Sequence, residues 1–169
     1  MMNTRRSLLG SVAAVFASVL MPLARAKPLT PAAALHVALE SSGLIYLSPL
    51  HKSGKESRCH AEIWFVQKNG VVYVVTANTA WRAKAITRGL DRARVWAGDV
   101  GPVKSAGDRY RSAPMFVAKG AQVTDAKEIE SVLDLYGSKY RVSWLLWSSR
   151  FHNGLKDGSR VMLRYTRET

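Results

Sequence analysis

The sequence predicts a mainly β domain of the α+β class, in which antiparallel strands close into a β-barrel and helices fill the connections. Apolar and polar residues alternate over 58–68, which is the pattern of a strand with one buried face. Asn69-Gly70 then favours a type I′ turn into the Val- and Tyr-rich run 71–76, so the two runs should pair as a hairpin. A short apolar run occupies 44–47, and further strands are expected at 92–97, 114–123 and 159–165.

Capping residues and glycines place four helices in the connections. The expected helices cover about 31–41, 80–88, 126–136 and 144–152. Asn78 and Thr79 can cap the second helix, and Gly89 marks its end. Asp125 can cap the third helix, which should end at Gly137.

Composition excludes several classes of protein. The chain has 169 residues, 25 Lys and Arg against 12 Asp and Glu, and one cysteine. This length suits a single domain whose core is stable without disulfides, and 47% hydrophobic residues with five Trp exclude a disordered chain. The potential metal ligands lack the spacing of a zinc site, so we expect no metal. They are His36, His51, Cys59, His60 and His152.

The short motifs of common enzyme classes are missing from the sequence. It contains no G-x-G-x-x-G, no P-loop and no G-x-S-x-G elbow, which leaves dinucleotide folds, P-loop enzymes and α/β-hydrolases unsupported. Cys59 and His60 are neighbours on a predicted strand and should point to opposite faces, which disfavours a Cys–His nucleophile pair. Catalytic side chains therefore stay unassigned, and we expect that side chains alone do not carry the chemistry.

Residues 1–26 have the three parts of a cleaved export signal. Arg5 and Arg6 precede an uncharged run over 8–23, and residues 24–26 form a small-x-small cleavage site. The run is shorter than the roughly 20 residues that a spanning helix needs, so we expect no stable membrane anchor. The paired arginines resemble a twin-arginine signal, which implies export of the folded protein by that machinery to the periplasm or a similar compartment. The alternative is an ordinary secretion signal with a chance arginine pair.

Cleavage would leave one domain, residues 27–169. It would remove three arginines and no acid, which leaves 143 residues and lowers the formal net charge from +13 to +10.

The segment 71–89 combines a strand, a polar turn and a helix whose first turns carry two cations. Free N–H groups and partial positive charge at a helix start attract phosphate, and Arg82 and Lys84 would complete an anion site. Polar residues in and before the turn add donors, and they are Thr76, Asn78 and Thr79. The alternative is an ordinary capped helix with solvated cations. Trp64 and Trp96 lie on the flanking strands. They either pack against a planar ligand ring or belong to the core.

The order of the elements over about 44–123, with 159–165 as the closing strand, carries a family resemblance. The matching segments are the run 44–50, the Ser53-Gly54 turn, the strand Ile63-Trp64-Phe65-Val66, the Asn69-Gly70 turn, the strand 71–76 and the strand 92–95. Together they resemble the pyridoxamine 5′-phosphate oxidase-like split β-barrel family, in its flavin- or deazaflavin-binding branch. The resemblance implies a split β-barrel of the FMN-binding type that forms a homodimer, with the cofactor at the subunit interface.

Site roles follow from the resemblance by position. The resemblance assigns contacts with the cofactor ring to Ile63 and Trp64, and contacts with its phosphate to Thr76, Thr79, Arg82 and Lys84. Asn78 is added as a hydrogen-bond donor because of its place in the polar turn. Two places depart from the family. Leu90-Asp91 replaces the usual Asn-Pro or Asp-Pro, and bulky Trp81 stands where the family has a small residue. An indole that filled the cleft would leave no room for a cofactor.

Three hypotheses for function remain. The first is an exported oxidoreductase that binds FMN, or alternatively a deazaflavin, and transfers hydride to a small, electron-poor or conjugated substrate. The second is a non-catalytic barrel that stores a cofactor or holds haem. The third, nucleic-acid binding, follows from the positive charge, but it lacks a recognised motif and conflicts with export, so no nucleic-acid partner is expected.

Overall fold

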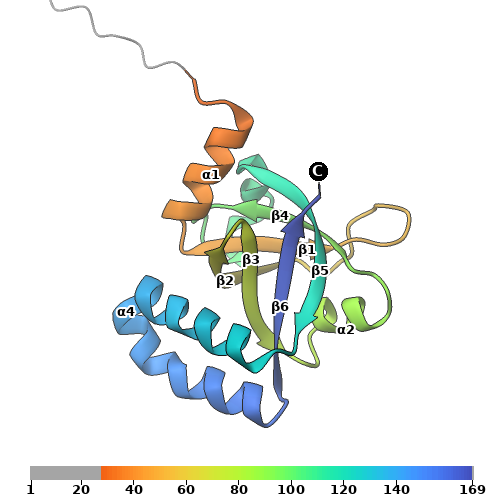
Figure 1. Cartoon of the computed structure of the whole chain (residues 1–169). Coiled ribbons are helices and arrows are strands. Elements are labelled where there is room, and N and C mark those ends of the chain that lie inside the picture. Colours follow the sequence, from red (N-terminus) through yellow and green to blue (C-terminus); the bar gives the residue numbers. More distant parts are fainter. Residues whose placement is uncertain (1–27, 169) are drawn as a thin grey trace, which may run out of the picture.

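Six antiparallel strands form a closed barrel, which confirms the predicted fold class (Figure 1). The computed structural model describes residues 28–168, and the predicted export signal lies outside the described residues. Around the barrel the strands follow the order β1-β2-β3-β6-β5-β4. The strands are β1 (Leu44–Pro49), β2 (Ala61–Lys68), β3 (Val71–Ala77), β4 (Arg92–Ala97), β5 (Met115–Val123) and β6 (Arg160–Arg167).

Helices cover the ends and one side of the barrel. They are α1 (Pro31–Ser41), α2 (Trp81–Thr87), α3 (Val103–Ala106), the 3-10 turn η1 (Arg109–Ser112) and α4 (Ala126–Lys156). In Figure 1, α1 lies at one end of the barrel, α2 lies near the other, and α4 folds back on itself along one side. No helix in residues 28–168 is both long enough and apolar enough to span a bilayer.

Side chains alternate between the barrel interior and its outer face, as the period-2 pattern predicts. On β3, Val72 and Val74 join the interior cluster, whereas Tyr73 and Val75 join an outer cluster with residues of α4. The interior is mostly aliphatic. Its buried members include Ile45, Leu47, Phe65, Val95, Ala118 and Leu163.

The hairpin turn between β2 and β3 has the predicted type I′ character. Asn69 and Gly70 have φ values of 51° and 77°, and such a turn requires positive φ at both central residues. The β2–β3 ladder that starts at this turn reaches only as far as Phe65 opposite Val74.

Beyond that pair the barrel wall opens. In the described ladders, Trp64 lies opposite Leu44 of β1, while Val75 lies opposite Met162 of β6. β2 therefore continues along β1 and β3 continues along β6, which leaves a split in the wall between Trp64 and Val75. This split positions the candidate site.

The predicted cap of α2 was wrong. The N-cap residue is Ala80, and within the described chain no side chain caps the helix. Asn78 instead donates from Nδ2 to the carbonyl oxygen of Gly158, at 2.6 Å, because the turn after β3 lies beside the end of α4. The helix ends at Thr87, followed by Gly89 with φ 73°.

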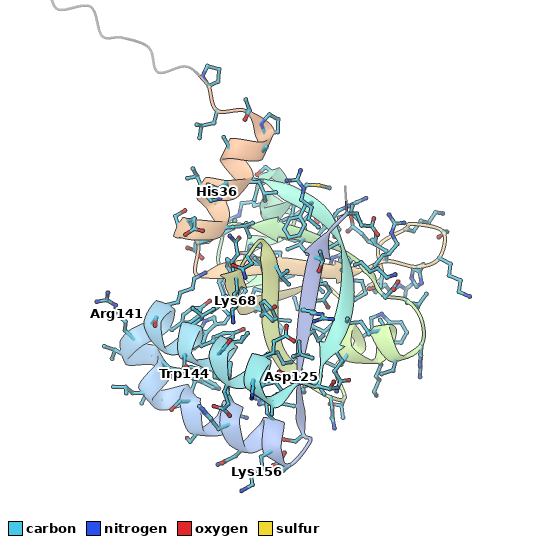
Figure 2. All side chains as sticks on the ribbon, viewed as in Figure 1. His36, Lys68, Asp125, Arg141, Trp144 and Lys156 are labelled. Carbon is cyan, nitrogen blue, oxygen red and sulfur yellow. The ribbon has the colours of Figure 1, made fainter. Side chains whose placement is uncertain are left out.

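The predicted end of a helix at Gly137 was also wrong. α4 runs on to Arg141, where φ 42° and ψ −106° break it, and a second half covers 142–156. A Cβ at Gly137 would lie 3.3 Å from Trp144 Cδ1, so this glycine lets the two halves pack closely rather than ending the helix. Figure 2 shows Arg141 at the outer tip of this helical hairpin and Trp144 between its two halves.

Candidate functional site

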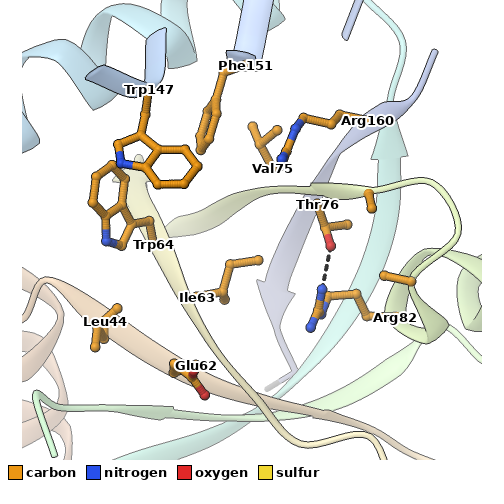
Figure 3. Close-up of a pocket in the computed structure, with 12 residues that line it drawn as sticks. Leu44, Glu62, Ile63, Trp64, Val75, Thr76, Arg82, Trp147, Phe151 and Arg160 are labelled. Carbon is orange, nitrogen blue, oxygen red and sulfur yellow. Dashed lines mark hydrogen bonds between the residues drawn. The ribbon is translucent and has the colours of Figure 1, made fainter. Parts of the chain in front are cut away.

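A pocket of about 480 Å³ lies at the split in the barrel wall (Figure 3). This volume falls within the roughly 300–1,000 Å³ typical of small-molecule sites. Strands β2 and β3, the start of α2, the start of β6 and the second half of α4 surround it. The lining residues are Leu44, Glu62, Ile63, Trp64, Val75, Thr76, Ala77, Ala80, Arg82, Trp147, Phe151 and Arg160.

Aromatic rings form one wall of the pocket. The Trp64 indole stacks on Tyr140, with ring centroids 4.3 Å apart and an interplanar angle of 7°. Trp147 meets Trp64 edge to face, with centroids 6.2 Å apart. Phe151 is buried and packs edge to face against Trp144, at 5.2 Å. These contacts fix the rings in place, which suits a wall for a planar apolar ligand.

Arg82 and Thr76 form a polar end of the same pocket. Thr76 is buried on β3, and its hydroxyl accepts a hydrogen bond from the Arg82 guanidinium (Figure 3). The Nε atom of Arg82 is buried and has no hydrogen-bond partner within residues 28–168. A buried donor without a partner costs free energy, so a ligand that accepts a hydrogen bond here would be favoured.

Arg160 adds a second guanidinium from the start of β6. It lies 5.5 Å from the Phe151 ring centroid. Burial and, to a smaller extent, Arg150 lower the pKa of Arg160, but a guanidinium is so strong a base that it stays charged at neutral pH. Gly154 makes room for it, because a Cβ there would lie 2.6 Å from Arg160 Cδ. Two cations and one carboxylate, Glu62, therefore border a mostly apolar cavity, and the net positive charge favours an amphipathic anion.

The structure brings some of the predicted cofactor-binding residues together and separates the others. The four that line the pocket are Ile63, Trp64, Thr76 and Arg82. The three that are exposed and outside its lining are Asn78, Thr79 and Lys84. The sequence placed five of the seven on one strand–turn–helix segment and the other two on the preceding strand. Of the five, only Thr76 on β3 and Arg82, the second residue of α2, reach the split.

Trp81 does not line the pocket at the split. It lines a separate pocket of about 580 Å³ with His51, Cys59 and two other residues. The Arg88 guanidinium lies 5.3 Å from its ring centroid. Neighbouring residues on a helix point in different directions, so Arg82 enters the split while Trp81 faces away from it. Trp96 also lies elsewhere, in an outer cluster with Tyr46 and Tyr110.

Sequence reasoning missed the part of the site that comes from distant segments. Trp147, Phe151 and Arg160 reach the pocket from the second half of α4 and from β6. The aromatic helix itself was predicted, but its position depends on the break at Arg141, which returns the chain to the split. The signal that was available was the apolar spacing of Trp144, Trp147 and Phe151, which indicates one packed helix face.

The described residues show no assembled metal or Cys–His centre. No three His, Cys, Asp or Glu side chains within 28–168 converge as a metal site. Cys59 and His60 lie just before β2 rather than on it, because that strand begins at Ala61. His60 Nδ1 lies 3.1 Å from the Tyr110 hydroxyl, and Cys59 lies beside the second pocket.

Comparison with known proteins assigns the fold. No protein-family model matches the chain, and no curated protein is significantly similar in sequence. Among solved structures, the haem storage protein HutZ from Vibrio cholerae matches with a TM-score of 0.55 and 14% identity, over 79% of this chain and 87% of HutZ. A putative pyridoxamine 5′-phosphate oxidase from Listeria innocua matches with a TM-score of 0.50 and 12% identity, over 79% of this chain and 90% of that one.

A third match is a putative 5-nitroimidazole antibiotic resistance protein from Bacteroides thetaiotaomicron, with a TM-score of 0.55 and 9% identity over 80% of this chain and 78% of that one. The fold is therefore the split barrel of pyridoxamine 5′-phosphate oxidase-like proteins, as the order of elements in the sequence indicates.

Proposed function

We propose that this chain binds FMN, or a deazaflavin, in the pocket at the split and serves as an oxidoreductase that transfers hydride to a small substrate. The observation that carries the proposal is the pairing of an aromatic wall with a half-buried arginine, Arg82, whose buried Nε atom lacks a partner within 28–168. A phosphate on the ligand would satisfy that donor, and a planar ring would suit the wall.

The residues present fit such a cofactor. Arg82 and Thr76 would hold its phosphate, with Arg160 as a further cation at the edge of the cavity. Trp64 and Trp147 would contact the ring and exclude water from it. A bound flavin or deazaflavin supplies the hydride chemistry, while the protein binds and orients the reactants. This division of labour explains how an oxidoreductase can lack the motifs of side-chain catalysis.

Non-catalytic haem binding is the second candidate, and the fold that this chain shares with the haem storage protein HutZ favours it. Haem iron is held by His, Cys, Met or Tyr side chains. The residues that line the pocket at the split include none of these four types. The separate pocket beside Trp81 does include His51 and Cys59, so haem binding would be expected there instead.

Arg82→Gln tests whether Arg82 binds the phosphate of the cofactor. The measurement is binding of FMN and of riboflavin to the full-length protein, followed by flavin fluorescence. The substitution should weaken FMN binding roughly tenfold or more and leave riboflavin binding nearly unchanged, because only FMN carries the phosphate. Arg88→Gln, at the C-cap of the same helix and outside the pocket lining, should change neither.

Equal losses for FMN and riboflavin would remove the phosphate role of Arg82. If neither flavin nor a deazaflavin binds, while haem binds and is lost in His51→Ala, the storage function replaces the proposed one. A bound cofactor that never exchanges hydride with any donor would likewise leave a binding protein rather than an enzyme.

We also propose that the protein is exported, on the strength of the 1–26 segment alone. Changing Arg5 and Arg6 to Lys should keep the protein in the cytoplasm, because twin-arginine transport depends on that pair. Unchanged export would indicate the ordinary secretion route. The homodimer stays a prediction of the family resemblance.

A further inference from the structure

A stripe of large aliphatic side chains projects into solvent from the second half of α4. Val142, Leu145 and Leu146 are 76%, 78% and 78% exposed. They share one face of the helix, because residues three and four apart are neighbours there. The opposite face is already used, since Trp144 and Phe151 pack into the layer beneath. The apolar stripe (Val142, Leu145 and Leu146) therefore does not contribute to the packed core.

Positive charge surrounds the apolar stripe. Residues 135–156 contain four Lys or Arg and neither Asp nor Glu. Three of these cations, Arg141, Arg150 and Lys156, are exposed. Figure 2 shows Arg141 at the outer tip of the helical hairpin, directed away from the barrel. Exposed aliphatic residues among cations are typical of a helix that lies in the interface of an anionic membrane.

Trp147 extends this face toward the pocket. Its side chain is 40% exposed, and the Arg150 guanidinium lies 5.2 Å from its ring centroid. Indole rings beside cationic side chains are common at membrane–water interfaces, where the ring meets the acyl boundary and the charge meets the headgroups.

We propose that the apolar stripe and its flanking cations dock this protein reversibly on the surface of an anionic phospholipid bilayer. A second copy of the chain is the rival occupant. A symmetric contact through this face would bring Arg141 and Arg150 close to the same residues of the other copy with no acid between 135 and 156 to offset them, whereas anionic headgroups complement that charge. Docking does not depend on which cofactor the pocket takes.

A reporter placed in the stripe tests the docking directly. In full-length protein carrying Cys59→Ser, Leu146→Cys is labelled with an environment-sensitive dye, and Val37→Cys on α1, another exposed aliphatic position, provides the matched control. Vesicles of equal phosphatidylglycerol and phosphatidylcholine should shift the emission of the dye at 146 to the blue and leave the dye at 37 unchanged. Because the readout is local, binding through residues 1–26 cannot produce this difference.

Charge variants test the contribution of the cations. Arg141→Gln with Arg150→Gln should weaken the response at 146 roughly tenfold, and salt should weaken it too. Lys104→Gln with Lys127→Gln removes the same charge from exposed positions elsewhere and should have little effect. An unchanged emission at 146 with vesicles overturns the proposal. So does a blue-shifted emission before vesicles are added that depends on protein concentration, because this would show that a second copy covers the stripe.

Discussion

The barrel interior and the layer beneath α4 are built from different chemistry. The interior is filled mainly by Val, Ala, Leu and Ile, which need no hydrogen-bond partner. The outer layer combines aliphatic residues with six aromatic rings, and its tyrosines carry hydroxyls that must find partners once buried. The difference indicates a division of roles, in which the interior defines the fold and the aromatic layer positions the pocket wall.

Tyr140 shows how the aromatic layer depends on the barrel. β1 begins opposite Trp64, so the next residue of β2, Phe65, lies beyond the end of that ladder. The Phe65 N–H donates to the Tyr140 hydroxyl at 2.9 Å, and that hydroxyl in turn lies 2.7 Å from the carbonyl oxygen of Gly43. The tyrosine thus replaces a missing strand partner, and its ring also supports Trp64.

The largest expected difference between the regions is in how they unfold. Leu163→Ala in the interior should cost about 2–5 kcal/mol of global stability, because the packed barrel cannot close the cavity. Phe151→Ala removes a ring from the layer at the pocket edge, where solvent can enter, so we expect a loss below the roughly 3–5 kcal/mol that is typical of an enclosed Phe→Ala cavity. Urea unfolding measures both losses.

Hydrogen exchange separates the two variants further. Phe151→Ala should raise exchange mainly in residues 142–156, whereas Leu163→Ala should raise it throughout the barrel. If both variants open the whole chain to the same extent, the layer is as integral to the fold as the interior, and the division of roles fails.

Removing the hydroxyl of either of two tyrosines in the aromatic layer should have the next-largest effect on stability. Tyr140→Phe leaves the Phe65 N–H without its acceptor and should cost about 1–3 kcal/mol. Tyr136→Phe removes only a donor to the carbonyl oxygens of Trp64 and Tyr73, so its cost should be nearer 0.5–1.5 kcal/mol, about the value of one hydrogen bond. Urea unfolding measures the loss of stability in each variant. Equal losses would show that Tyr140 has no special role at the end of the ladder.

The same pair bears on function. Loss of the Tyr140 hydroxyl should let the Trp64 ring move and weaken binding of any planar ligand in the pocket more than Tyr136→Phe does. Ligand titration of the two variants compares the effects, and a larger loss in Tyr136→Phe would contradict this assignment.

The two regions also differ in how far the sequence predicts them. Alternation along each strand is a local pattern, so the hairpin turn at Asn69-Gly70 and the inward-facing residues follow from it. The split does not, because it arises where Trp64 pairs with β1 while Val75 pairs with β6, which is distant in the chain. Gly137 has the local signature of a helix end, but its small size serves contact with Trp144, which only the folded hairpin brings near.

The candidate site was predicted in part for the same reason. Thr76 and Arg82 lie close in sequence and meet in the pocket, as expected from the strand–turn–helix pattern. Lys84 shares that pattern but faces solvent, since two residues along a helix turn a side chain well away from its neighbour. Trp147 and Arg160 come from segments that no local pattern connects to the turn.

The smallest expected effect concerns Lys139, which lies where the two regions meet. Its Nζ atom is 3.5 Å from the Phe65 ring centroid. Burial lowers the pKa of Lys139 from 10.5 to about 8, although Asp99, Glu40 and the ring favour the charged form. Between pH 8 and 10.5 the unfolded chain therefore binds more protons than the native protein, so this lysine makes the free energy of unfolding rise with pH across that window.

Lys139→Met should remove that rise and stabilise the protein at pH 7. The pKa shift of Lys139 alone would correspond to a larger gain in stability. Because water still reaches the ammonium group, we expect a gain of about 1 kcal/mol. Urea unfolding from pH 7 to 9.5 should give a difference between variant and native protein that shrinks as pH increases, whereas Lys127→Met, exposed in the first turn of α4, should show no such trend. A constant difference for Lys139→Met would mean that the lysine is as well solvated in the folded protein as in the unfolded chain. The contact between barrel and layer would then be open to water at this point.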